Sequence, residues 1–152
     1  MEAQFCLSSS QFCLSSRKTE SQTISVKCLV TQLLSQLQPL AVTHKSFIIN
    51  DVPADFYATA DKNNLTVVIS SLLSSIISRS RSSCIRLSAK RYNNIILFQL
   101  RDSNVEFTHT PHHDWQEINM LAKKLGGCII EDDIRKKHRI ITFSFRSLSN
   151  AA

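Results

Sequence analysis

The sequence predicts an α+β fold, a two-layer sandwich with three helices on one face of a mixed sheet. Three segments repeat apolar residues at intervals of three and four, the spacing that places them on one side of a helix. Short runs with the alternation typical of strands follow each of these segments. One helix followed by two strands, three times over, favours stacked layers over a helical bundle.

The length and composition fit one domain preceded by a tail. The chain has 152 residues and a formal net charge of +6, and a single domain usually runs to about 100–200 residues. We expect a weakly ordered tail over residues 1–25, in which QFCLSS occurs twice, at Gln4–Ser9 and Gln11–Ser16, before a polar linker at Arg17–Gln22. The folded domain is then expected over residues 26–148.

The first helix is predicted at residues 27–38, where leucines recur on one face. Pro39 should end it, because proline lacks a backbone N–H and its ring clashes with the preceding turn. Two short strands are expected next, at Ser46–Asn50 and Phe56–Thr59, around a turn at Asp51–Pro53.

The second helix, at residues 61–78, carries the clearest pattern in the chain. Asp61 is placed to accept hydrogen bonds from the free backbone N–H groups of the first turn. The side opposite the apolar face is mostly serine. The apolar face consists of Leu65, Val68, Ile69, Leu72, Leu73, Ile76 and Ile77.

The third helix is predicted at residues 114–125. Asp114 and Glu117 have the spacing of a capping box, and Gly126 is placed to end the helix. The remaining strands form an antiparallel hairpin, Cys84–Lys90 with Ile95–Leu100, and a final pair, Cys128–Ile130 and Ile140–Phe145, joined by a charged turn at Glu131–His138.

Composition excludes several classes of protein. No uncharged apolar run reaches the length of about 18 residues that a membrane helix needs, so we expect no membrane partner. Five scattered cysteines without a CxxC pair fit neither a disulfide framework nor a zinc cage. Only two glycines occur, whereas loops that wrap phosphates usually need several.

Three motifs resemble those of one family. The run Ile69–Ile77 is similar to a helix motif with two asparagines, whose positions are taken here by Ser71 and Ser75. A strand ending at Asp102 resembles an Asp-x-Gly box in which Asn104 replaces the glycine. A helix, two glycines and two strands follow. Together these motifs, over about Val26 to Phe145, resemble the ATP-binding domain of sensor histidine kinases, a branch of the GHKL or Bergerat-fold ATPases.

The resemblance implies a nucleotide pocket made by Asp102, Asn104, Ser71 and Ser75, with Asp102 reading adenine. The chain departs from the family in ways that weaken this pocket. Residues 103–113 are too few for the family's mobile lid and contain no glycine, and a serine hydroxyl is a poorer Mg²⁺ ligand than an asparagine side chain. We therefore expect a degenerate, pseudokinase-like domain with no catalytic residues, no metal site and no cofactor.

The resemblance also implies a place in two-component signal transduction. We expect a non-catalytic protein-interaction module that binds a kinase or a response regulator in the cytoplasm. The alternative is a residual ATP-binding domain, which binds ATP and Mg²⁺ through Asp102 with Ser75 or Asn104 and supports histidine-kinase phosphoryl transfer with a partner.

Other clusters favour ordinary surface structure. His109, His112 and His113 precede Asp114 in the segment HTPHHD, which we expect to be an exposed loop rather than a metal site. We expect neither His44 nor His138 to be a phosphoacceptor.

Two groups of basic residues are expected to be solvated faces or turns, without specific nucleic-acid binding. They are Arg79, Arg81, Arg86, Lys90 and Arg91, and Arg135, Lys136, Lys137 and Arg139.

Overall fold

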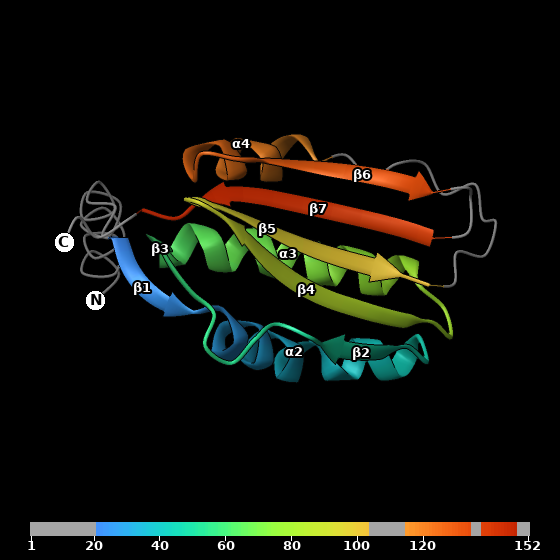
Figure 1. The fold of residues 1–152 in the computed structure, drawn as a ribbon. Coiled ribbons are helices and arrows are strands. Elements are labelled where there is room, and N and C mark those ends of the chain that lie inside the picture. The colour runs from blue at the N-terminus through green and yellow to red at the C-terminus, as the bar shows by residue number, and fades with distance from the viewer. Residues whose placement is uncertain (1–20, 104–114, 135–137, 149–152) are drawn as a thin grey trace, which may run out of the picture.

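The computed structural model describes residues 21–103, 115–134 and 138–148. Within these ranges three helices lie on one face of a mixed five-stranded sheet, as the sequence predicted (Figure 1). In chain order the elements are β1 (Ser21–Ser25), α2 (Val26–Thr43), β2 (Phe47–Asn50), β3 (Tyr57–Asp61), α3 (Lys62–Arg79), β4 (Cys84–Tyr92), β5 (Ile95–Asp102), α4 (Gln116–Lys124), β6 (Cys128–Ile134) and β7 (His138–Arg146).

The five-stranded sheet has the order β2-β4-β5-β7-β6. β2 runs parallel to β4, and the other three neighbouring pairs are antiparallel. The predicted hairpin is confirmed, because β4 and β5 pair from Ile85 opposite Asp102 to Tyr92 opposite Ile95. The mixed character of the sheet therefore comes from its β2 edge.

The core lies between the helices and the sheet, and α3 forms its centre. All seven predicted apolar residues of this helix are fully buried. The Asp61 side chain accepts hydrogen bonds from the backbone N–H groups of Asn63 and Asn64, as expected of a helix N-cap. Among the described residues, no helix is both long and apolar enough to cross a lipid bilayer.

The first helix is longer than predicted. α2 continues through Pro39 to Thr43, so the expectation that Pro39 ends it was wrong. Proline removes one backbone donor, but the turn after it closes, since His44 N–H donates to the Leu40 carbonyl at 3.1 Å. Ala41 is buried in the core. Burial of this last turn offsets the lost hydrogen bond.

The N-terminal strand was not predicted. Ser21 and Gln22 were expected in a linker, and residues 21–25 in a weakly ordered tail, but these residues form β1. β1 pairs antiparallel with β3 in a separate two-stranded sheet. β2 and β3 consequently do not pair with each other, although they follow one another in the chain. Residues 1–20, with both QFCLSS repeats, lie outside the described ranges.

The start of the third helix differs from the prediction. The N-cap residue of α4 is Trp115 rather than Asp114, and its side chain makes no capping hydrogen bond. Asp114 lies outside the described residues.

Two glycines end α4 with a specific turn. Gly126 has φ of +78°, and its N–H donates to the Lys123 carbonyl at 2.9 Å. The Gly127 N–H donates to the Ala122 carbonyl at 3.0 Å. These two bonds make a Schellman motif, which satisfies carbonyls that the helix leaves free. The prediction that Gly126 ends the helix is confirmed.

The last two strands are longer than expected. β6 continues to Ile134 and β7 begins at His138, so much of the expected charged turn at Glu131–His138 is strand. Strand pairing carries Glu131 onto the helix-covered side of the sheet, in phase with the buried Ile129. The Glu131 carboxylate therefore faces the helices and is buried.

Candidate functional site

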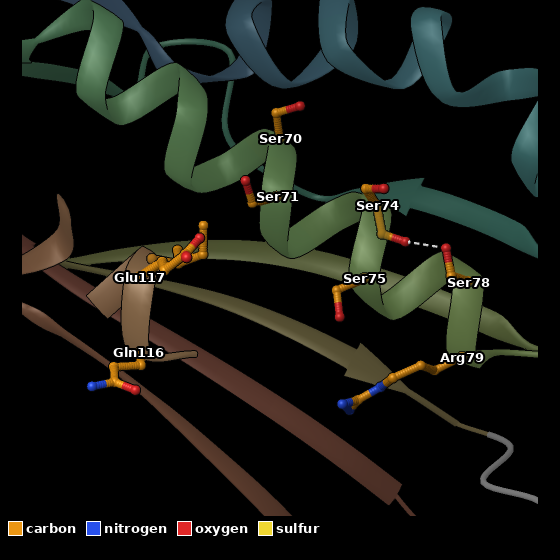
Figure 2. A pocket seen from close by; sticks show the side chains of 9 residues that line it. Ser70, Ser71, Ser74, Ser75, Ser78, Arg79, Gln116 and Glu117 are labelled. Atoms are coloured by element: carbon orange, nitrogen blue, oxygen red, sulfur yellow. Dashed lines mark hydrogen bonds between the residues drawn. The ribbon is translucent and has the colours of Figure 1, made fainter. Parts of the chain in front are cut away.

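A cleft of about 630 Å³ lies between α3 and α4 (Figure 2). The apolar residues of α3 point into the core, so its serines are left on other sides of the helix, where their small side chains leave space. The volume is within the range of small-molecule sites, about 300–1,000 Å³. The lining residues on α3 are Ser70, Ser71, Ser74, Ser75, Ser78 and Arg79, and those on α4 are Gln116, Glu117 and Ile118.

The structure brings only part of the predicted site together. Ser71 and Ser75 both line the cleft. Asp102 is not among the lining residues: it lies at the end of β5, is only 1% exposed and already takes part in an interaction within the chain. Asn104 lies outside the described residues. The described lining of the cleft thus includes two of the four residues expected to form the nucleotide pocket.

The serines of the cleft differ in how their hydroxyls are used. Ser78 Oγ donates to the Ser74 carbonyl at 2.7 Å, a local bond within the helix (Figure 2). Ser75 Oγ is buried and makes no hydrogen bond with the described residues. A buried hydroxyl without a partner is costly, so Ser75 marks the point in the cleft where a polar ligand atom would gain most.

Arg79 of the cleft lining belongs to a buried group of charges that sequence reasoning missed. Arg79 of α3 and Arg139 of β7 both pair with the Glu131 carboxylate, the second at 3.3 Å between Nε and Oε1. Trp115 donates from its indole Nε1 to Glu131 Oε2 at 2.8 Å. One carboxylate of β6 thus joins α3, β7 and the residue that begins α4.

The expectation that these basic clusters are solvated faces was wrong for two members. The side chain of Arg79 is 12% exposed and that of Arg139 is 7% exposed. A guanidinium is buried only where a paired carboxylate offsets its desolvation, and here Glu131 has that role. The available signal was the position of Glu131 two residues after Ile129, which places it on the inner side of any strand that continues past Ile130.

The structure describes only some of the other candidate residues. His44 Nδ1 lies 3.1 Å from the Ser80 carbonyl, a contact of a packed side chain. The described residues include no group of three or more histidines, cysteines or acidic residues placed to hold a metal ion. The HTPHHD segment, with His109, His112 and His113, lies outside the described residues.

The described lining of the cleft can be compared with what Mg-ATP requires. This lining supplies neutral hydroxyls, one guanidinium and one amide, together with the Glu117 carboxylate in the first turn of α4. Hydroxyls are weaker ligands for a hard cation than carboxylates or amide carbonyls, so the serines of α3 offer Mg²⁺ little, and the stronger oxygen ligands of the described lining are those of Gln116 and Glu117 on α4. A carboxylate at a helix N-terminus also repels phosphates from the end of the helix that would otherwise attract them.

The two glycines lie away from this cleft, in the turn between α4 and β6. A Cβ on Gly127 would overlap the carbonyl group of Ser144 and lie 2.8 Å from Phe145 Cα. Neither glycine lines the cleft between α3 and α4. Gly126 serves helix termination, and Gly127 allows close packing against β7.

Known proteins resemble this chain in structure rather than in sequence. No family model matches the chain, and no curated protein sequence matches it. The structure of histidine kinase AdeS of Acinetobacter baumannii does match, with a TM-score of 0.75 at 13% identity over 87% of this chain and 70% of that one. The catalytic domain of histidine kinase ThkA matches with a TM-score of 0.68 at 12% identity, over 84% of this chain and 96% of that domain. This chain has the fold of histidine kinase catalytic domains.

A third structure contains a partner protein. It is histidine kinase ThkA in complex with the response regulator TrrA, with a TM-score of 0.67 at 11% identity over 99% of this chain and 49% of the other. The histidine-kinase-like fold that the sequence motifs implied is therefore confirmed. At such low identity the likeness concerns the fold, and function has to be argued from the residues of this chain.

Proposed function

We propose that this histidine-kinase-like domain does not catalyse phosphoryl transfer and acts by binding another protein of two-component signalling. The partner is a histidine kinase or a response regulator. We place this function in the cytoplasm, with neither a membrane nor a specific nucleic acid as partner.

One observation carries the non-catalytic part of the proposal. Asp102, the residue that matches the adenine-reading aspartate, is 1% exposed and is absent from the lining of the cleft. The cleft itself presents serine hydroxyls where the family motif has asparagines. Phosphoryl transfer depends on positioning and on electrostatic stabilisation around a bound metal, and both are poorly supported by this lining.

The kind of partner is suggested by the fold. One similar structure is a histidine kinase in complex with a response regulator. A domain whose pocket residues have changed but whose fold is kept can still bind other proteins through its outer surface. We infer that this surface is how the domain takes part in signalling. The proposal predicts direct binding between the full chain and at least one kinase or response regulator of its own cell.

An alternative function keeps nucleotide binding. It is favoured by the volume of the cleft, about 630 Å³, and by the unpartnered Ser75 hydroxyl. In this alternative the domain binds ATP and Mg²⁺ and supports histidine-kinase phosphoryl transfer with a partner.

Thermal unfolding with and without Mg-ATP separates the two functions. With 1 mM ligand and a Kd of 100 μM, binding would stabilise the fold by about 1.4 kcal/mol, which corresponds to a Tm increase of roughly 3–6 °C. We expect no increase, for the parent or for Asp102→Asn. A Tm increase that Asp102→Asn abolishes would establish the alternative.

A further inference from the structure

One face of the five-stranded sheet carries no helix within the described ranges. Side chains alternate along each strand, and members such as Leu87, Phe98 and Phe143 are buried beneath the helices. The alternate side chains point the other way. Figure 1 looks onto this second face, with β4 and β5 in front of α3. We call it the open face.

Large apolar side chains are exposed on the open face. Phe47 and Ile49 of β2 are 77% and 37% exposed, and Ile130 of β6 is 52% exposed. Tyr92 and Ile95 lie directly opposite each other on β4 and β5, and both are exposed. Apolar side chains therefore occur on both edge strands and at the hairpin end, so that a partner covering the face would remove all of them from water.

Positive charge occupies the central strands of the open face. Arg86 of β4 and Arg101 of β5 are direct cross-strand partners, and Lys90 follows Arg86 on the same face. Like charges directly opposite each other in a sheet are unfavourable unless an anion lies between or beside them. Asp51 pairs with Arg86 at 3.2 Å, and both side chains remain well exposed. Asp132 supplies a second carboxylate, but at the β6 edge.

The area of the open face limits the size of any interface that a partner can form with it. Four strand spacings of about 4.8 Å and a strand length of about eight residues at 3.4 Å give an area on the order of 500 Å². A standard stable interface buries about 800 Å² on each partner. The open face therefore suits a weak, reversible signalling contact rather than a permanent dimer.

The side chains of the open face indicate which kind of partner would fit it. Three of the five exposed apolar side chains are isoleucines, and the two exposed rings, Phe47 and Tyr92, lie beside opposite ends of β4, too far apart for successive nucleic-acid bases to stack on them. A second copy packed face to face would bring the Arg86 and Arg101 side chains of both copies together. A partner whose apolar patch carries carboxylates matches both the isoleucines and the central arginines.

From this geometry we propose that the open face is the docking surface for an acidic, partly apolar patch on a partner protein. The carboxylates of that patch lie over Arg86 and Arg101, and its apolar groups cover Ile130 and Ile49. The proposal rests on the proposed function, since it names the surface through which the signalling partner is bound.

Photocrosslinking in the cell of origin tests the surface while the partner is still unidentified. A photoreactive amino acid replaces Ile130 in the full chain, and in a matched control it replaces Met120 of α4, which is 62% exposed on another surface. We expect the probe at position 130 to form an adduct with a protein that carries an acidic surface patch, and the control not to form that adduct.

The identified partner then allows a quantitative test. The double variant Arg86→Glu with Arg101→Glu should weaken its binding at least tenfold, whereas Lys123→Glu with Lys124→Glu, an equal charge change on α4, should change binding less than threefold. Unfolding curves of all variants establish that each is folded. Equal effects of the two double variants would refute the assignment of the surface.

The outcomes separate this inference from the proposed function. An adduct at position 130 with an acidic protein outside two-component signalling supports the open face and contradicts the proposed function. An adduct only with a second copy or with nucleic acid, or no adduct at position 130, overturns the inference. In that last case a kinase or response regulator captured at position 120 would still support the proposed function.

Discussion

Substitution of Gly127 by alanine should be far more damaging than the same substitution at Gly126. The added Cβ at position 127 would overlap the Ser144 carbonyl and lie 2.8 Å from Phe145 Cα, where ordinary contact begins at 3.4 Å. The backbone of β7 would have to move by 0.6 Å to clear Phe145 Cα alone, the difference between these two distances, and further to clear the Ser144 carbonyl. β7 cannot move freely, because it is paired with β5 on one side and β6 on the other.

The expected cost follows from the bonds that such a movement breaks. Three hydrogen bonds hold this junction: Arg146 N–H to the Leu125 carbonyl at 2.9 Å, Gly127 N–H to the Ala122 carbonyl at 3.0 Å, and Cys128 N–H to Ser144 Oγ at 3.2 Å. At about 1 kcal/mol each, their loss amounts to about 3 kcal/mol. A typical domain is stable by only about 5–15 kcal/mol.

Gly126 provides the matched control because its constraint is different. Its φ of +78° is left-handed, which costs a residue with a Cβ roughly 1–2 kcal/mol. The nearest atom to an added Cβ is the Arg146 Cβ at 3.1 Å. Asparagine tolerates this conformation, so Gly126→Asn should be milder than Gly126→Ala, whereas Gly127→Asn should be as damaging as Gly127→Ala.

Urea unfolding followed by far-UV circular dichroism measures these differences. With an m-value of about 2 kcal/mol per molar urea, a loss of 3 kcal/mol lowers the unfolding midpoint by about 1.5 M. A Gly127→Ala variant whose unfolding free energy stays within about 1 kcal/mol of the parent would refute the close approach of β7 to this turn.

Two other substitutions test the core and the buried charges. Leu72→Ala should lower the unfolding free energy by about 2–5 kcal/mol, because it leaves a cavity beside the sheet. Val67→Ala, on the exposed side of the same helix, should have a small effect. Equal losses of stability in the two variants would contradict the packing of α3. Glu131→Ala should cost about 3–5 kcal/mol, because it takes the carboxylate away from two buried guanidinium groups. Asp132→Ala, at an exposed neighbouring position, should change stability by no more than about 0.5 kcal/mol, and a similar loss at both positions would exclude a special role for the buried carboxylate.

The sequence was sufficient to predict the helices because their apolar residues repeat on one face. All seven apolar residues assigned to the face of α3 are buried. β1 was missed because only one of its five residues, Ile24, is buried, which leaves too little alternation to detect. The parallel pairing of β2 with β4 was also not predicted. It places Phe47 opposite Cys84 and Asn50 opposite Leu87, and pairing between residues so far apart in the chain depends on tertiary packing.

The candidate site was predictable only in part. Ser71 and Ser75 were assigned to the pocket through the resemblance of Ile69–Ile77 to the family's helix motif, and both line the cleft. The burial of Arg79 could not be foreseen from its own neighbours, since it depends on Glu131, 52 residues further along the chain. The burial of Asp102 likewise depends on neighbouring strands, where Ile85 and Arg139 are its cross-strand partners.

The two ends of the described domain meet on a single strand. Ser21 is the cross-strand partner of Asp61, and the Leu148 N–H donates to the Thr59 carbonyl at 2.8 Å, so both ends are fastened to β3. A domain with adjacent ends can be circularly permuted, or inserted into a loop of another protein, without spreading the host loop. This domain could therefore be inserted into a loop of another protein as one unit, with both junctions at the same end of the molecule.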